Sequence, residues 1–211
     1  MHRIRSAIAL ALALAALALV LAGCSASVTT GGSSSPSASD AGTTTSTKTY
    51  SNPQYGFSIT YSDRFTQGKP VSGTGAGGSS VFDVVFADKS GPVVSDRYVN
   101  AIQVSVYQLA REINPSEVPK IKSELQGIVD QLMSSLPSAK VVEKLSPVKV
   151  NGVPGFALKY TYTESGKALT AVTFFLISGK YEYQITAQAT TADWDSLKGE
   201  LEAAVQSFTV Q

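Results

Sequence analysis

The sequence is poor in the side chains on which many enzyme mechanisms depend. Its 211 residues include one histidine, His2, and one cysteine, Cys24. The rest of the chain can therefore form no intramolecular disulfide, no catalytic triad that uses histidine or cysteine, and no zinc site of the usual kind. This scarcity favours binding over catalysis, and we expect no enzyme activity, no cofactor and no metal site.

The chain also has little net charge. Its 17 basic and 16 acidic residues give +1, and removing Arg3 and Arg5, which belong to the expected leader, leaves 15 basic residues against 16 acidic ones, or −1. Such a chain has no basic excess to release counterions from nucleic acid and no polybasic stretch to bind anionic lipid. We therefore expect no nucleic-acid partner.

The strongest signal lies at the amino terminus. A short cationic segment, residues 1–6, precedes an unbroken apolar run of 16 residues, 7–22. As an α-helix this run would cover roughly 24 Å, which is less than the roughly 30 Å of a hydrocarbon core. The segment is typical of a secretion signal and not of a permanent span.

The apolar run ends in Leu21-Ala22-Gly23-Cys24, which resembles the lipobox of bacterial lipoproteins. The resemblance implies that residues 1–23 are a signal peptide and that Cys24 carries a diacylglyceryl group, usually with a further acyl chain. Each buried methylene contributes about 0.8 kcal/mol, so such chains would anchor the protein to a membrane without a helical span. The alternative is an ordinary signal peptide that ends beside a cysteine. We expect the extracytoplasmic face of the cell membrane or, in a host with two membranes, the outer membrane, because Ser25 follows the cysteine.

Residues 24–49 are expected to be the lipidated cysteine and a disordered tether. From 25 to 49 the chain has 15 serines and threonines in 25 residues, and Val28 is its one aliphatic side chain larger than alanine. Such a segment cannot bury enough apolar surface to offset its ordering entropy. As a flexible coil it would span roughly 25 to 30 Å.

Residues 50–211 are predicted to form one α+β domain in which amphipathic helices cover an antiparallel sheet. Alternating apolar and polar residues predict strands, and short connections at Asn151-Gly152, 164–167 and Gly179-Lys180 join the last four strands into a meander. A first helix is predicted from the N-cap Ser116 to Pro137, and a second from a capping box formed by Thr190 and Asp193. The predicted strands are 57–61, 81–86, 102–107, 141–150, 153–163, 169–178 and 181–189.

These elements resemble the PsbP-like family, whose fold is shared with the Mog-type Ran-binding proteins. The resemblance rests on the segment from Tyr55 to Tyr61, on the meander, and on the closing helix with its end at 207–210. Many relatives have Pro-x-x-Trp after the first strand, where this chain has Ser62-Asp63-Arg64-Phe65. The resemblance covers 50–211 and implies an αβα sandwich with a non-catalytic role in docking onto larger assemblies.

Aromatic side chains offer the candidate binding residues. Tyr160 and Tyr162 lie on one face of a predicted strand, and Tyr181 and Tyr183 lie on one face of another. They either pack in the core or form a partly exposed aromatic face that binds a protein or a carbohydrate. Full burial in a structure would remove the second interpretation.

Two functions remain open. The first is a non-enzymatic binding or scaffolding lipoprotein that docks to an unidentified envelope protein through sheet edges and loops. The second is a carrier of an apolar or lipid ligand between helices and sheet, which would need an apolar cavity of a few hundred Å³.

Overall fold

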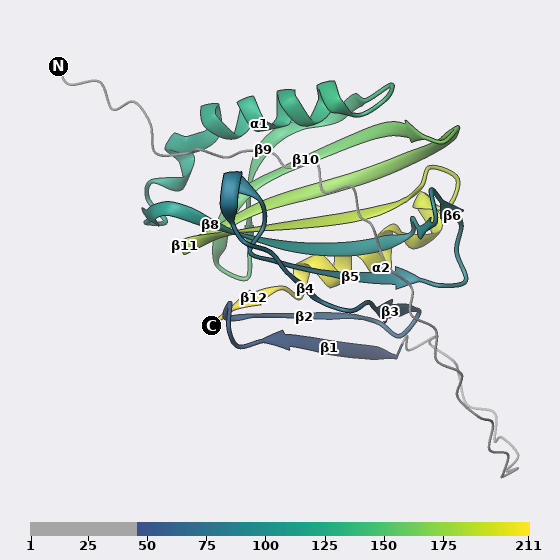
Figure 1. Ribbon diagram of the computed structural model, residues 1–211, viewed down its shortest axis with the longest axis horizontal. Coiled ribbons are helices and arrows are strands. Elements are labelled where there is room, and N and C mark those ends of the chain that lie inside the picture. The colour runs from purple at the N-terminus through teal and green to yellow at the C-terminus, as the bar shows by residue number, and fades with distance from the viewer. Residues whose placement is uncertain (1–45) are drawn as a thin grey trace, which may run out of the picture.

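The computed structural model describes residues 46–211, which form antiparallel β-sheets and two α-helices (Figure 1). The large sheet has the order β3 (Phe65–Gln67), β5 (Phe82–Asp88), β8 (Ala101–Ile113), β11 (Lys167–Thr190), β10 (Val153–Glu164) and β9 (Lys140–Val150), with β4 (Val71–Ser72) also paired to β5. A small sheet contains β1 (Thr47–Asn52), β2 (Phe57–Ser62) and β12 (Thr209–Val210), and β6 (Val93–Val94) forms a hairpin with β7 (Arg97–Tyr98). The helices are α1 (Lys122–Ser135) and α2 (Trp194–Gln206), with short 3₁₀ turns η1 (Ala76–Gly78) and η2 (Val118–Ile121).

Strand β11 turns back on itself in its middle. Its 24 residues would span roughly 80 Å if extended. Instead the hydroxyls of Thr173 and Thr186 lie 2.9 Å apart, and the Thr191 N–H donates to the Ala168 carbonyl at 2.9 Å. The reversal falls at Gly179, whose φ of +59° suits the first residue of a two-residue hairpin turn. The first arm pairs with β10 and the second with β8, so the predicted hairpin at Gly179-Lys180 is confirmed.

Apolar side chains pack on both faces of the large sheet. On one face, α2 and the small sheet cover β5, β8 and the second arm of β11, and Ile59, Val104 and Leu201 are completely buried there. On the other face, α1 packs over β10 and the first arm of β11 (Figure 1). The expected covering of the sheet by helices is therefore partial, because α2 shares its face with the small sheet and α1 covers about half of the other face.

The structure corrects two predicted boundaries and one predicted helix cap. The domain begins with β1 at Thr47, inside the segment 24–49 that was expected to be disordered, because threonines suit a strand and the Thr49 hydroxyl lies 2.9 Å from that of Thr60. The single helix predicted from Ser116 is a 3₁₀ turn followed by α1, which starts at Lys122. The capping box is half formed: Thr190 Oγ1 accepts the Asp193 N–H at 3.2 Å, but the Thr190 N–H donates to Asn100 instead.

The predicted signal peptide 1–23, Cys24 and the tether up to residue 45 lie outside the described residues. Within 46–211, the structure has no helix that is both long enough and apolar enough to cross a bilayer.

A pair of glycine substitutions tests the packing of the sheet. A Cβ at Gly155 in β10 would lie 2.1 Å from the Phe175 carbonyl oxygen, whereas a Cβ at the exposed Gly127 of α1 meets nothing within 4 Å. We expect Gly155→Ala to lower the free energy of unfolding by about 1 to 3 kcal/mol, since backbone must move. Gly127→Ala should raise it by about 0.5 to 1 kcal/mol through helix propensity. Urea unfolding measures both, and equal effects would contradict this packing.

Candidate functional site

The half of the sheet face that α1 leaves uncovered carries a group of polar side chains, which we call the polar strip. Asp83 pairs with Ser105, Ser105 with Gln184, and Tyr107 with Glu182. Residues opposite each other in neighbouring antiparallel strands point to the same face, so these side chains share one surface. The strip consists of Asp83 from β5, Gln103, Ser105 and Tyr107 from β8, and Glu182 and Gln184 from the second arm of β11.

Hydrogen bonds within the strip end on its two carboxylates. Ser105 Oγ donates to Asp83 Oδ1 at 2.5 Å, and Ser80 Oγ donates to Asp83 Oδ2. Gln103 Nε2 donates to Ser105 Oγ at 3.0 Å, which extends this chain by one residue. The strip is thus preorganised on its β5 side, because neighbouring side chains fix the Asp83 carboxylate.

Glu182 gives the strip its second carboxyl group. Only 2% of this residue is exposed, and its Oε1 accepts a hydrogen bond from Gln184 Nε2 at 2.7 Å. Burial raises the pKa of Glu182 to about 7, while the bond from Gln184 opposes the rise. Burial also raises the pKa of the neighbouring Tyr107 to about 12, helped by the negative charges of Asp83 and Glu182.

The strip is rich in acceptors and poor in positive charge. Neither Asp83 nor Glu182 forms an ion pair with any residue from 46 to 211. Carboxylate oxygens accept their strongest hydrogen bonds from cationic donors such as Lys and Arg. The arrangement therefore suits a binding partner that brings N–H donors, above all charged ones. The same residue range contains no cluster of three potential metal-binding side chains.

The four tyrosines singled out from the sequence do not form one surface. Tyr160 and Tyr162 belong to the core under α1 and are 5% and 6% exposed, whereas Tyr183 is 1% exposed in the core on the opposite face. Tyr181 is partly buried against that second core. The Tyr162 hydroxyl donates to Gln188 at 2.5 Å, and the Tyr183 hydroxyl donates to the Tyr55 carbonyl at 2.7 Å. Tyr160, Tyr162 and Tyr183 are thus packed inside the domain, and Tyr181 alone keeps a share of its surface in solvent.

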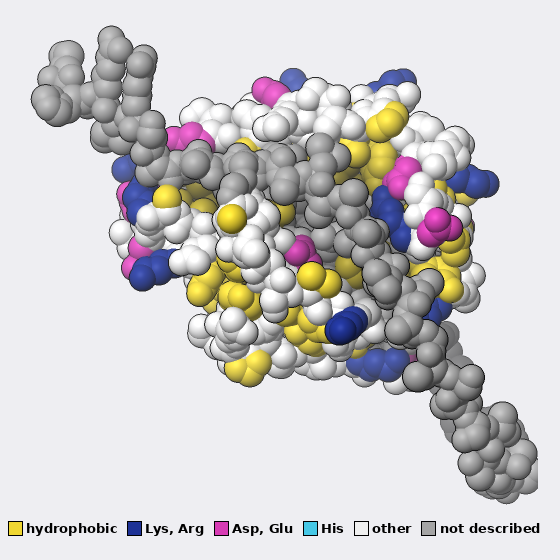
Figure 2. Space-filling view, viewed as in Figure 1, with side chains coloured by type: hydrophobic (Ala, Val, Ile, Leu, Met, Phe, Trp, Pro, Cys, Tyr) yellow, Lys and Arg dark blue, Asp and Glu magenta, His cyan; other side chains and the backbone are white. Residues whose placement is uncertain are grey.

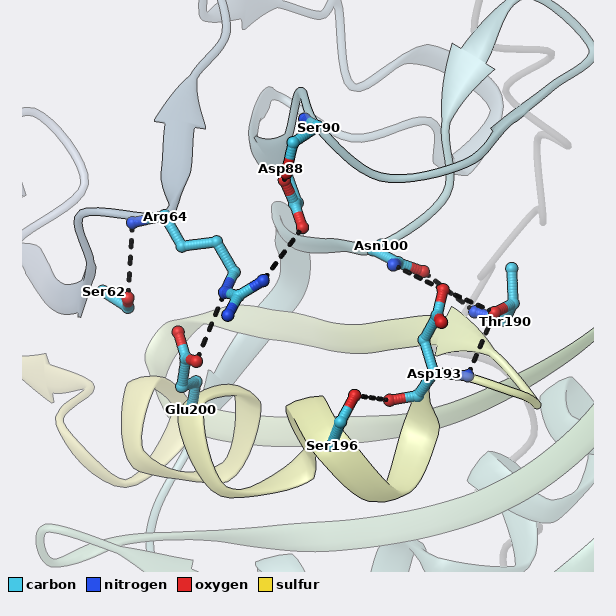
Figure 3. A network of polar contacts seen from close by, with 9 residues as sticks. All are labelled: Ser62, Arg64, Asp88, Ser90, Asn100, Thr190, Asp193, Ser196 and Glu200. Carbon is cyan, nitrogen blue, oxygen red and sulfur yellow. Dashed lines mark hydrogen bonds and ion pairs between the residues drawn. The ribbon is translucent and has the colours of Figure 1, made fainter. Parts of the chain in front are cut away.

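A second polar cluster holds α2 against the sheets (Figure 3). Arg64 lies between Asp88 at the end of β5, with Nη1 and Oδ2 3.6 Å apart, and Glu200 of α2, with Nε and Oε1 3.3 Å apart. Asn100 Nδ2 donates to Asp193 Oδ2 at 3.0 Å at the start of the helix. This bond, together with one from Thr190, holds the pKa of Asp193 below its usual value. Since these side chains bond chiefly to one another across element boundaries, their role is structural.

Sequence patterns could not single out the polar strip. In the sequence, Glu182 and Gln184 alternate with the apolar residues Tyr181, Tyr183 and Ile185, and this is the ordinary pattern of a strand with one face in water. Only the pairing with β8 brings them beside Ser105 and Tyr107. The available signal was that two amphipathic strands, β8 and the second arm of β11, both carry carboxyl, amide or hydroxyl side chains on their polar face. That signal would have indicated the strip only if the two strands were known to be neighbours.

Comparison with known families settles the classification. The family model described as PsbP matches residues 45–210. The chain belongs to the PsbP family. The match confirms the resemblance predicted over 50–211 and starts slightly earlier, in agreement with the position of β1. No curated protein matches this PsbP-family chain.

Solved structures show the same fold at low sequence identity. Cyanobacterial PsbP (CyanoP) from Synechocystis sp. PCC 6803 is 15% identical, with 82% of this chain and 98% of that chain covered and a TM-score of 0.52. LpqN, described as involved in cell envelope biogenesis of Mycobacterium tuberculosis, is 14% identical, with 81% and 87% covered and a TM-score of 0.51. These similarities concern the fold alone.

The ionisation of Glu182 should make stability depend on pH. Its folded pKa of about 7 exceeds the ordinary value of 4.5, so its contribution to stability is complete below pH 4.5 and is lost as the pH rises through 7. Glu182→Gln keeps the shape without the charge, and we expect it to equal the wild type at pH 4 and to exceed it by about 3 kcal/mol at pH 8. Urea unfolding at both pH values measures the difference. Parallel pH profiles would show that Glu182 is ordinarily solvated.

Proposed function

We propose that this PsbP-family domain is a lipid-anchored binding module on the extracytoplasmic side of the cell envelope and has no enzyme activity. The lipobox-like sequence ending in Cys24 supports the anchor. The fold shared with LpqN, whose description concerns cell envelope biogenesis, agrees with an envelope role. The absence of histidine and cysteine from residues 25–211 supports binding without catalysis.

The polar strip is the observation that carries the binding role. A carboxyl group that is 2% exposed costs stability when it ionises, and an apolar residue at the same position would avoid that cost. The strip also presents fixed acceptors on a rigid sheet, which lowers the ordering entropy that a partner must offset. We infer that its partner is an envelope protein that brings lysine, arginine or backbone N–H groups onto the strip.

The carrier role, our second candidate, receives less support from the packing. Leu125 and Val129 of α1 lie against a core that contains Leu158 of β10 and Phe175 of β11, and each of these residues is at most 2% exposed. Their side chains fill the space between α1 and the sheet that a lipid would need. A carrier function would require α1 to move away from the sheet.

The anchor is tested by replacing the lipidated residue. In a bacterial host that processes lipoproteins, the wild type should incorporate radiolabelled palmitate and sediment with membranes. Cys24→Ser should incorporate none and appear in the soluble extracytoplasmic fraction, because the thioether can no longer form. A wild-type protein whose mature form carries no acyl chain by mass spectrometry would contradict the anchor.

Photo-crosslinking tests the binding surface. Tyr107 of the strip and Tyr181 are both half-buried tyrosines, but they lie on opposite faces of the sheet. With p-benzoylphenylalanine at either position in the lipoprotein in cells, we expect one dominant adduct from position 107 and at least fivefold less from position 181. The adduct at 107 should weaken in the Glu182→Gln background. Equal yields, or adducts from position 181 alone, would contradict the assignment of the strip.

A further inference from the structure

One end of the domain gathers the starts and ends of many strands, and the chain from Cys24 enters there. Residue Thr47 opens β1 and pairs with Ser62, and the next strand places Phe65 beside Asp88. Across the large sheet the same end contains Ala101 beside Gln188 and Glu164 beside Lys167. Figure 1 shows this end at the right, with β6, and the carboxyl terminus at the opposite end. We call it the entry end.

Exposed apolar side chains concentrate at the entry end. Among residues 46–211, five large apolar side chains are exposed: Val71, Val93, Tyr98, Val141 and Val142. Val93 and Tyr98 face each other in the β6–β7 hairpin, and Val141 and Val142 lie at the start of β9, so four of the five are at this end. Val71 pairs with Asp83 near the start of β5, at the other end. Figure 2 shows hydrophobic side chains toward the right-hand edge, with both basic and acidic side chains beside them.

The hairpin that carries Val93 and Tyr98 is held firmly. The Arg97 guanidinium pairs with Glu164, and the hydroxyls of Ser95 and Ser165 lie 2.9 Å apart, so two ties join the hairpin to the β10–β11 turn. Its turn residues Ser95 and Asp96 have φ values of 49° and 61°, as a type I′ turn requires, although neither is glycine. Such conformations are costly and persist where the surroundings enforce them. The two apolar side chains are thus presented to the outside by a fixed scaffold.

Charged side chains of both signs share the entry end with these apolar side chains. Lys48, Lys89, Lys140 and Lys167 are exposed at or next to strand ends on the entry end. The exposed acids at this end are Asp63, Asp96, Glu143 and Asp195, of which Glu143 pairs with Lys159 and Asp195 with Lys198. A mixture of apolar side chains, tyrosine and lysine is the composition of surfaces that rest in the lipid headgroup region.

We infer that the entry end is a membrane-contact surface, and that its occupant is the bilayer in which the lipid on Cys24 is inserted. The inference rests on the lipid anchor proposed above. Only the 22 residues 25–46 separate Cys24 from β1, which starts at this end, so the entry end is the part of the domain attached nearest to the lipid. Short tethering gives the weak contacts of four apolar side chains a high effective concentration of membrane. The polar strip lies on the face of the sheet, away from this end, because Asp83 is near the start of β5 and Glu182 follows the turn at Gly179.

Two exposed valines provide a matched test. Val93 is 56% exposed at the entry end and Val71 is 55% exposed at the other end. With Cys24 acylated, Val93→Cys or Val71→Cys supplies the single reactive thiol of the mature chain for an environment-sensitive fluorophore. The lipidated full chain is reconstituted into vesicles of phosphatidylethanolamine and phosphatidylglycerol that contain headgroup-labelled nitroxide lipid, and flotation is measured first. We expect at least twofold stronger quenching at position 93 than at position 71.

The outcomes separate the inference from the anchor. Chains that float with stronger quenching at position 93 support the contact. Floating chains with equal quenching at the two positions contradict the contact surface and leave the anchor standing. The fluorophore at position 93 could instead report an apolar environment by its emission and yet not be quenched by nitroxide lipid. That result indicates that a second copy or another protein covers the surface, and it also contradicts the inference. Chains that do not float contradict the anchor and the inference together.

Discussion

The reversal of β11 at Gly179-Lys180 is the constraint on which the rest of the structure depends. Before the turn, odd-numbered residues such as Leu169 and Phe175 face α1, and after it the even-numbered Glu182 and Gln184 face the same side. The change follows from alternation along each arm and from a turn of two residues. One arm thus gives α1 an apolar surface, and the other continues that face as a polar one beside β8.

A border of hydrogen-bonded side chains separates the two halves. The Thr173 hydroxyl lies 3.3 Å from that of Tyr160 and 2.9 Å from that of Thr186, and Gln188 accepts from Tyr162 and donates to the Val99 carbonyl at 3.0 Å. These groups are satisfied, so they fix the pairing of the arms without a large desolvation cost. Glu182 differs from them, because its carboxyl group has a raised pKa and gains a charge close to neutral pH. That difference distinguishes the polar strip from ordinary core polarity.

Much of the fold could be predicted because local rules and tertiary packing agree. Alternation and the glycine turn at 179 predicted both arms of β11, and the stripe from Trp194 to Phe208 predicted α2. β1 could not be predicted, because its serines and threonines resemble the segment before it and only pairing with β2 makes them a strand. The candidate site could not be predicted for a similar reason. Alternation shows that Tyr160 and Tyr183 each lie on one face of a strand, but it does not show which face of the sheet is covered by helices. The entry end could not be predicted either. Its residues are far apart in the sequence, and only the pairing of the strands brings them to the same end.

The two faces of the large sheet differ in role. On one face, the polar cluster around Arg64 and Asn100 holds α2 in place, and the other face carries the preorganised polar strip. The central claim is that the second arm of β11 buries a carboxyl group in that strip. The most direct measurement is the titration of the Glu182 side-chain carboxyl carbon by NMR, assigned by comparison with Glu182→Gln. We predict a pKa of about 7. A value near the ordinary 4.5 would contradict the burial of Glu182, and with it the assignment of the strip as the binding surface.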